Sequence, residues 1–389
     1  MAQEDGAGVD FATLRAYRRE RVRAEMERRG VDVLVLGRRA NAKYVGGHRW
    51  LWRAVLTPFG PLCIFARESG EIHLLGCTWD DGVPREIPTA RLSALTWNPR
   101  NTIDAMRRVG ALAGARRIGV DGMSPFLAEA LAELAPRAEL VDGEALMRDV
   151  RAVKLPAEID CIRTALAIAE GALAAVALEL RPGATERDLA ARAAQELARF
   201  GTPLPAFEAS FCATPRDADG SAPPLRLRPG ERPLAAGDLV ACRVGVLHAG
   251  YEGAALRTLP CLGPSGSPSQ AQLDLHASWH AAQGALVARC RPGAAVSDLR
   301  KAWLDAGEEL PPLPLANGVG LGVEPPIAPG AGGEEPREDP PLQQGMVLCV
   351  QGYVWRPGVG GYLGGETLRI GPAEPLRLSR MPDAPPGAG

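Results

Sequence analysis

The sequence predicts an α+β protein of two domains, with an α/β domain over residues 1–150, an internally duplicated domain over 151–380 and a disordered tail over 381–389. Three observations predict this organisation. The chain has 389 residues, of which 46% are hydrophobic, and this length favours two hydrophobic cores. Helical and strand patterns alternate in the first third. In the remainder, one pattern of helix, turn and helix occurs twice.

The first domain begins with an amphipathic helix over residues 11–29, which Gly30 ends. A buried strand follows at 31–37. Further patterns predict a hairpin at 61–65 and 72–75, a helix at 101–114, a strand at 117–121, a helix from Ser124, a strand at 138–143 and a short helix capped by Asp142. This alternation predicts an α/β domain.

The segment 43–61 interrupts these patterns and places two tryptophans beside cationic side chains. A rigid aromatic ring stacks on planar or cationic groups, so Trp52 and Arg53 are candidate ligand-binding residues. The alternative is a packing patch at an edge or an interface.

The second domain contains the duplication. Residues 169–193 and 281–303 both read as a helix, an Arg-Pro-Gly-Ala turn and a second helix, with Thr185 and Ser297 as the expected caps. A repeated helix pair followed each time by β-rich sequence predicts a pseudo-symmetric domain with a cleft between its halves.

The composition excludes several classes of partner. A formal net charge of −2 gives no reason to expect nucleic acid or an anionic membrane. We expect no transmembrane segment, and residues 1–10 are acidic and polar, unlike a signal peptide. The eight cysteines are scattered without C-x-x-C pairs, which is typical of reduced, buried thiols. The expected location is cytoplasmic.

Six ordered motifs support a family assignment. They are the R-x-x-K opening at 151–154, PGATE at 182–186, the hairpin at 238–258, NGVGLGVEPP at 317–326, the segment 343–361 and GETLRI at 365–370. In order and spacing the chain resembles the creatinase and aminopeptidase P family (M24). The resemblance implies a pita-bread fold for the second domain and a ribonuclease H-like first domain. It also implies a homodimer, in which the 43–61 loop approaches the other subunit's cleft.

The opening of the second domain also matches the family in its charges. Arg151, Lys154 and Glu158 follow the family's R-x-x-K-x-x-x-E pattern. We expect these three charged groups to cap and solvate the first turn of a long helix.

The family's metal ligands are replaced in this chain. Its metallopeptidases hold two metal ions on two aspartates, one histidine and two glutamates. The matching positions are Arg243, Ala254, Asn317, Gln351 and Gly365, with Glu366 directly after the last. One carboxylate does not hold two divalent ions, and a guanidinium repels a cation. We therefore expect no metal and no other cofactor.

Creatinase, in the same family, hydrolyses a C–N bond without metal by means of a histidine and glutamates. The position of that histidine falls near Arg226, and two glutamate positions read Leu256 and Gln351. The resemblance therefore transfers neither set of catalytic groups unchanged.

Polar residues nevertheless remain at these positions. Buried polar groups are costly without partners, so we expect Arg226, Arg243, Asn317 and Gln351 to bind a small anionic ligand such as a carboxylate. The alternative is structural: Arg243 replaces the lost metal charge by pairing with a protein glutamate, Glu366 or Glu252.

Catalysis would need another group, because arginine and amide side chains do not transfer protons at neutral pH. Glu252, Glu324 and Glu366 are the candidate acid/bases. Two function classes stay open. One is a metal-independent enzyme acting on a small carboxylated, amide-bearing or amidine-bearing molecule. The other is an inactive pseudo-peptidase that binds a peptide, protein or small molecule, and an active Xaa-Pro aminopeptidase is a third reading.

Overall fold

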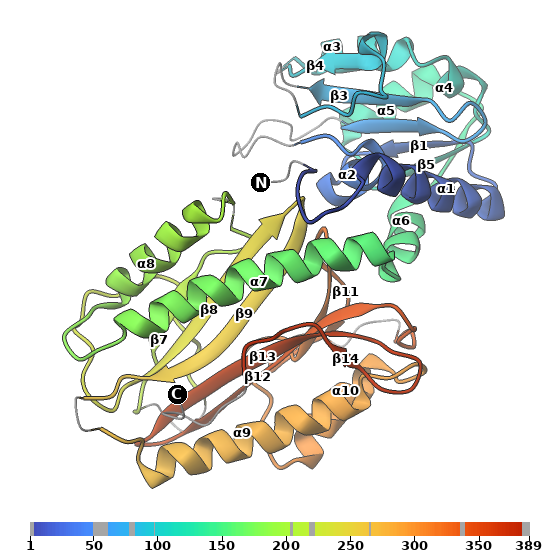
Figure 1. Cartoon of the computed structure of the whole chain (residues 1–389). Coiled ribbons are helices and arrows are strands. Elements are labelled where there is room, and N and C mark those ends of the chain that lie inside the picture. The colour runs from blue at the N-terminus through green and yellow to red at the C-terminus, as the bar shows by residue number, and fades with distance from the viewer. Residues whose placement is uncertain are drawn as a thin grey trace. The chain divides into compact units, whose positions relative to one another are not determined.

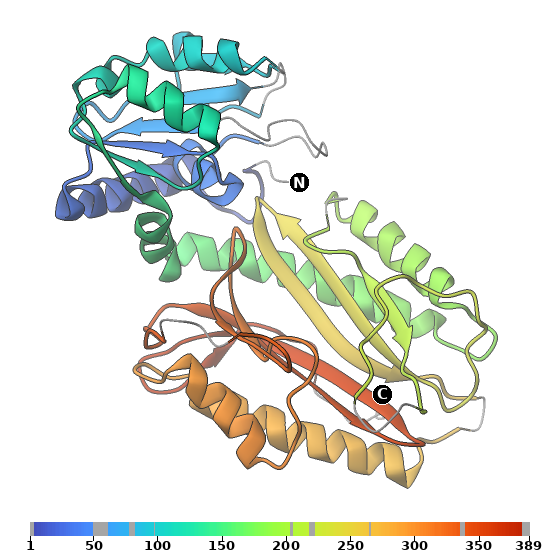
Figure 2. The same ribbon diagram turned by 180° about the vertical axis from the view of Figure 1, so that it is seen from behind.

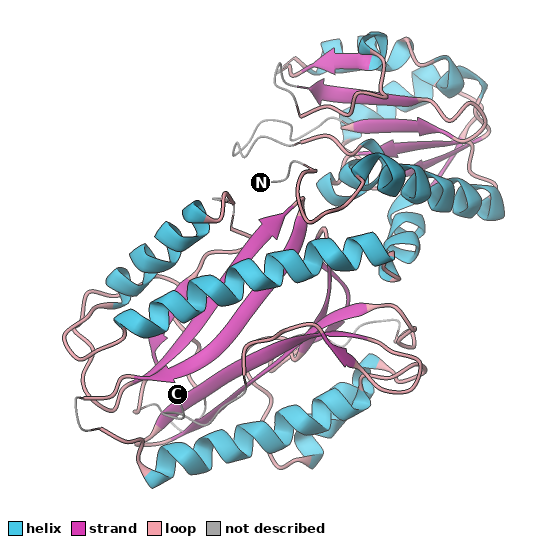
Figure 3. Cartoon of the chain, in the orientation of Figure 1, coloured by secondary structure: helices cyan, strands magenta, loops and turns pink. Residues whose placement is uncertain are grey.

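A computed structural model describes residues 4–49, 61–77, 82–96, 98–202, 205–217, 222–263, 266–334 and 339–382. The chain divides into two compact units, Ala2–Arg151 and Ala152–Gly389 (Figure 1). Each unit combines one sheet with helices (Figure 3), which confirms the predicted α+β class.

The first unit is built on a six-stranded mixed sheet in the order β4-β3-β2-β1-β5-β6. Strand β1 runs parallel to β5 and antiparallel to β2, and the predicted hairpin is β2–β3. The elements are α1 (Phe11–Arg29), β1 (Val33–Leu36), α2 (Arg39–Gly46), β2 (Cys63–Ala66), β3 (Ile72–Cys77), the 3-10 turn η1 (Thr89–Arg91), β4 (Leu92–Ala94), α3 (Pro99–Arg107), α4 (Gly110–Gly114), β5 (Arg117–Val120), α5 (Pro125–Leu134), β6 (Glu139–Asp142) and α6 (Gly143–Ala152).

Capping residues set three helix ends of this unit where the sequence predicts them. Asp10 accepts hydrogen bonds from the first turn of α1, Gly30 ends that helix in the left-handed region, and Ser124 caps α5. The single helix expected over 101–114 is wrong, because α3 ends at Arg107 and α4 begins at Gly110. Val109 between them is buried in the core, and glycine at 110 and 114 weakens helix continuation.

The second unit has an eight-stranded sheet in the order β11-β10-β12-β13-β9-β8-β7, with β14 beside β13. Two long hairpins, β8–β9 and β12–β13, form its centre and meet between β9 and β13. The elements are α7 (Pro156–Glu179), α8 (Glu186–Arg199), β7 (Ser210–Ala213), β8 (Leu239–His248), β9 (Tyr251–Pro260), α9 (Gln270–Arg289), α10 (Val296–Asp305), β10 (Ala316–Gly320), β11 (Gly322–Ala328), β12 (Val347–Arg356), β13 (Gly360–Arg369) and β14 (Leu376–Arg377).

The predicted duplication appears as two helix pairs on one sheet. The pair α7 and α8 belongs to the β8–β9 half, and α9 and α10 belong to the β12–β13 half (Figures 1 and 2). Thr185 caps α8 as expected. Ser297 does not cap α10, whose N-cap is Ala295; the Ser297 hydroxyl instead donates to Asp339 Oδ2 at 2.5 Å.

Glycines in the central strands let the helices pack close to the sheet. A Cβ at Gly253 would lie 2.3 Å from the backbone carbon of Ala165 on α7, and one at Gly364 would lie 2.2 Å from the Trp279 ring on α9. These two glycines therefore face the helices. Because side chains alternate along a strand, Glu252, Ala254 and Gly365 face the other side.

Helix α7 is the one helix of the described residues that, by length and composition alone, would suffice to cross a membrane. Its apolar residues Ala165, Ala169 and Leu173 are fully buried against β8 and β9. That is the packing of a core helix.

Candidate functional site

The register of the sheet brings to one face the positions that the sequence resemblance matches to the family's metal ligands. Arg243 on β8 lies opposite Leu256 on β9, Leu256 lies opposite Gly365 on β13, and Gly365 lies opposite Gln351 on β12. Cross-strand partners point to the same side of a sheet. These four positions therefore form one row across the two hairpins, on the face away from the helices.

The remaining two positions belong to neighbouring rows. Ala254 pairs with Gly245, two residues from Arg243, and Asn317 on β10 pairs with Cys349, two residues from Gln351. Residues two apart on a strand share a face. We call this surface, which carries residues 243, 254, 317, 351 and 365, the Arg243 face.

Arg243 lies on β8, at one end of this row, and pairs with no carboxylate of the residues that the structure describes. Its guanidinium carbon is 5.1 Å from the centroid of the Phe207 ring. Its buried Nε has no hydrogen-bond partner, and no ion pair joins the side chain to any residue that the structure describes. Burial lowers the pKa of Arg243, and the charge of nearby Glu252 opposes this effect. The arrangement leaves a guanidinium fork open to an anion.

Glu252 is the carboxyl group whose charge acts on the pKa of Arg243. Its side chain, on β9, is only 5% exposed and forms no hydrogen bond or ion pair within the described ranges. Burial and the charge of Glu324 raise the pKa of Glu252 to about 7, although the charge of Arg243 acts in the opposite direction. A carboxyl group with this pKa exchanges a proton readily at neutral pH.

Glu324 is held by a buried ion pair. Its Oε2 lies 2.8 Å from Lys154 Nζ, with the two side chains 4% and 3% exposed, and its Oε1 accepts from the Leu321 amide at 3.1 Å. The expectation that Lys154 is solvated is therefore wrong, because its ammonium group is buried in an ion pair with Glu324 of β11. Glu158 is buried too, although its carboxylate does cap the helix, accepting from the Leu155 amide at 2.7 Å.

Glu366 points to the other side of the sheet. It follows Gly365 by one residue, so it shares the face of Gly364, towards the helices, and its carboxylate lies 2.8 Å from Arg377. Pairing of Arg243 with Glu366 is therefore contradicted. For the same reason Glu366 is not an acid/base of the Arg243 face.

The two amides lie on β12 and β10, with β13 and β9 between them and Arg243, and each amide nitrogen is held by a backbone carbonyl. Asn317 Nδ2 donates to the Gly318 carbonyl at 3.0 Å, and Gln351 Nε2 donates to the Pro314 carbonyl at 2.9 Å. Their side-chain oxygens accept no hydrogen bond from the residues described. These oxygens remain available to donors on a ligand.

Arg226 is not brought to this surface by the described contacts. Arg226 donates to Glu186 Oε1 at 2.7 Å, and Glu186 also accepts from the Ala213 and Gly230 amides. Arg226 is thus neutralised by a carboxylate of α8. Trp52 and Arg53 lie outside the described residues.

Comparison with known proteins agrees with the fold. The sequence profile of metallopeptidase family M24 matches residues 160–371, more than half of the chain, and that of the creatinase/prolidase N-terminal domain matches residues 18–153. The chain belongs to metallopeptidase family M24. The resemblance found in the sequence is thereby confirmed.

Relatives of this M24 protein carry peptidase names. An Xaa-Pro dipeptidase of Pyrococcus horikoshii is 28% identical over 280 residues, covering 69% of this chain and 75% of the relative. The prolidase structure from that organism has a TM-score of 0.73 at 22% identity and covers 94% of this chain and 99% of that one. The Xaa-Pro dipeptidase from Bacillus anthracis also has a TM-score of 0.73, at 18% identity, over 96% and 99% of the two chains. These structures share the pita-bread fold.

The donor groups of this M24 protein do not fit the two metal ions of a metallopeptidase. Within the described ranges, no group of three or more histidine, cysteine, aspartate or glutamate side chains is placed to hold a metal. At residues 243, 317 and 351 the Arg243 face offers a guanidinium and two neutral amides, whereas a dinuclear site requires bridging carboxylates.

Sequence reasoning missed Phe207 and Cys349. Phe207 stacks on Arg243, and the buried Cys349 thiol lies close enough to Glu252 and Arg243 for their charges to influence it. Only Cys349 had a usable signal, since it precedes Gln351 by two residues in a strand pattern.

The Glu252→Gln variant should lose part of the pH dependence of stability. Because the folded pKa of about 7 exceeds the ordinary 4.5, the folded protein keeps a proton that the unfolded chain releases. This contribution is complete below pH 4.5 and is lost as the pH rises through 7, for a total of about 3 kcal/mol. Glutamine does not ionise. In urea unfolding, the free energy of unfolding of the variant should therefore rise relative to that of the wild type between pH 5 and pH 8. The exposed Glu208→Gln variant is the control; an equal response in both variants contradicts the assignment.

Proposed function

We propose that this M24 protein binds a small carboxylated molecule on the Arg243 face and hydrolyses a C–N bond in it without a metal. The observation that carries the proposal is the Arg243 guanidinium, which is largely buried and has no ion pair within the described part of the chain. A buried cation without a counter-charge is costly, and its fork geometry matches a carboxylate.

Glu252 is the proposed acid/base of this reaction. Its carboxylate takes a proton from a water molecule, whose oxygen then forms a bond to the carbonyl or amidine carbon of the ligand. When the C–N bond breaks, the protonated Glu252 returns the proton to the leaving nitrogen, so the enzyme ends as it began. A pKa of about 7 allows Glu252 to perform both transfers near neutral pH.

Two other functions compete with this proposal. Cleavage of Xaa-Pro dipeptides is the activity named for the Pyrococcus relatives, and 28% identity over 280 residues favours it. Binding without turnover is the second, because the same guanidinium can hold a carboxylate whether or not a reaction follows.

The test combines metal analysis with a ligand screen on the purified protein. N-acyl amino acids, dipeptides and carboxylated amidines are added with and without a chelator, while melting temperature and amine release are measured. We expect carboxylated ligands to stabilise the protein and to release amine equally in both conditions. Stabilisation without release indicates a binding module. Stoichiometric metal with chelator-sensitive Xaa-Pro cleavage overturns the proposal, and so does a panel that neither stabilises nor reacts.

A further inference from the structure

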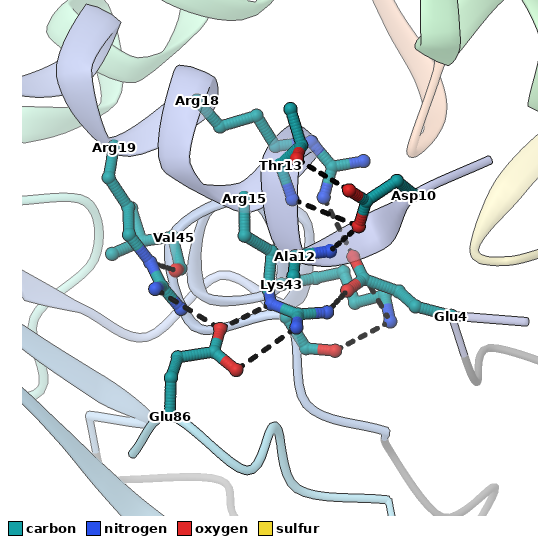
Figure 4. Close-up of polar contacts among 11 residues, drawn as sticks. Glu4, Asp10, Ala12, Thr13, Arg15, Arg18, Arg19, Lys43, Val45 and Glu86 are labelled. Atoms are coloured by element: carbon teal, nitrogen blue, oxygen red, sulfur yellow. Dashed lines mark hydrogen bonds and ion pairs between the residues drawn. The ribbon is translucent and has the colours of Figure 1, made fainter.

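A carboxylate is enclosed by cations in the first unit. Glu4, in the segment before α1, points into a cluster formed by α1 and α2 (Figure 4). Its Oε2 lies 2.6 Å from Arg15 Nη1, and its Oε1 lies 2.7 Å from Arg18 Nη1 and 3.8 Å from Lys43 Nζ. Three cations thus surround one carboxyl group.

This cluster is buried. The Glu4 side chain is 3% exposed, and the side chains of Arg18 and Lys43 are equally enclosed. Burial alone would raise the pKa of Glu4, yet the charges of Lys43 and Arg18 and the hydrogen bond from Arg15 together lower it. The surroundings therefore stabilise a negative charge strongly enough to overcome its desolvation.

Each cation has an anchor other than Glu4. Arg15 donates to the Glu86 carboxylate through Nε at 2.6 Å and through Nη2 at 3.0 Å. The guanidinium carbon of Arg18 lies 5.4 Å from the centroid of the Tyr44 ring. Lys43 Nζ donates to the Gly47 carbonyl at 3.0 Å. The helices that carry these residues do not include Glu4. The three cations are therefore positioned by the fold and not by the carboxylate they hold.

A glycine forms one wall of the site. Gly47 has a φ of 73°, and a Cβ there would lie 2.2 Å from Arg15 Cδ and 3.0 Å from Glu4 Oε2. A side chain at this position would displace the arginine and crowd the carboxylate. The bare Cα leaves room for a carboxyl group between the two helices.

We propose that Arg15, Arg18 and Lys43 form a carboxylate-binding site that Glu4 occupies as a tethered ligand, and that the site accepts a free monocarboxylate when residue 4 provides none. A ligand on a short tether competes at an effective concentration on the order of millimolar. Free carboxylates therefore bind the wild type only above that range. This inference concerns the first unit and does not depend on the function proposed for the Arg243 face.

Chemical rescue of Glu4→Ala tests the site. Alanine removes the carboxymethyl group beyond the Cβ, and propionate supplies the same charge on a chain one carbon longer. We expect Glu4→Ala to lower the melting temperature by roughly 5 to 10 °C, and propionate to restore at least about half of the loss. Propionamide and chloride at equal ionic strength should restore little. A phosphate arm shows whether the site selects carboxylates over other anions.

Two further variants locate the effect. Rescue should disappear in Glu4→Ala/Arg18→Met, and the exposed Glu20→Ala variant on α1 should show neither loss nor rescue. If propionate acts no better than chloride, or acts equally on the Arg18→Met double variant, the proposal fails and the cluster is a fixed ion pair. Should Glu4→Ala be recovered unfolded, refolding from urea decides instead: folded protein is expected with propionate and not with propionamide, and equal yields overturn the site.

Discussion

Replacing Lys154 with methionine should lower the free energy of unfolding by about 3–5 kcal/mol, because it leaves the Glu324 carboxylate buried without its cation. The pair spans 2.8 Å with both side chains almost fully enclosed. Water cannot replace the ammonium group easily in such a place, and Glu324 must either stay charged at a cost or take up a proton. Urea unfolding at neutral pH measures the loss.

A matched control and a double variant separate charge from volume. Lys301 on α10 is an exposed lysine, so Lys301→Met should change stability by less than about 0.5 kcal/mol. Lys154→Met/Glu324→Leu removes both charges and should recover most of the loss, since well-packed apolar groups often replace a buried ion pair without cost. If the double variant is as unstable as the single one, packing of the lysine stem explains the loss and the ion pair does not.

The sequence predicts best those elements whose ends carry a local signal. Asp10 and Gly30 mark α1, and Ser124 followed by proline marks α5. Such residues act on neighbouring backbone groups, so no knowledge of the fold is needed. The break between α3 and α4 had no comparable signal, because burial of Val109 in the core depends on the rest of the unit.

The sequence predicts which residues of the site share a face of the sheet, but it does not predict which side chains they pair with. Period-two alternation places Arg243 and Ala254 on one surface once the hairpin register is known. Glu366 follows Gly365 by one residue, so its side chain lies on the opposite surface, where it forms an ion pair with Arg377. Lys154 and Glu324 are separated by 170 residues, and local patterns carry no information about such contacts.

Arg243→Met should weaken carboxylate binding and raise the free energy of unfolding. Loss of a buried charged partner should weaken binding by about 100-fold or more. The free protein, in contrast, should gain about 1–3 kcal/mol, because methionine removes a largely buried guanidinium that has no ion pair in the described structure. Isothermal titration and urea unfolding of the same two proteins measure both quantities.

Arg257 provides the matched control, since it is a buried arginine on β9 whose guanidinium is satisfied. It donates to the carbonyls of Leu256, Gly365 and Met381 at 2.8, 2.5 and 2.9 Å. Arg257→Met leaves these carbonyls without donors and should lower stability by about 1–3 kcal/mol. Two buried arginines in neighbouring strands are thus expected to respond with opposite sign.

The sign of the change in stability that Arg243→Met causes at pH 8 decides between the two roles considered for this residue. If Arg243 serves as the counter-charge of Glu252, its loss leaves an ionised, buried carboxylate and lowers stability at pH 8, and Arg243→Met/Glu252→Gln restores it. If Arg243 is kept for a ligand, stability rises at pH 6, where Glu252 is largely protonated because its pKa is raised to about 7. Removing the arginine raises that pKa further, so Glu252 stays neutral to a higher pH and the gain extends with it. If Arg243 binds a ligand, its replacement by methionine raises the free energy of unfolding and lowers the affinity for the ligand.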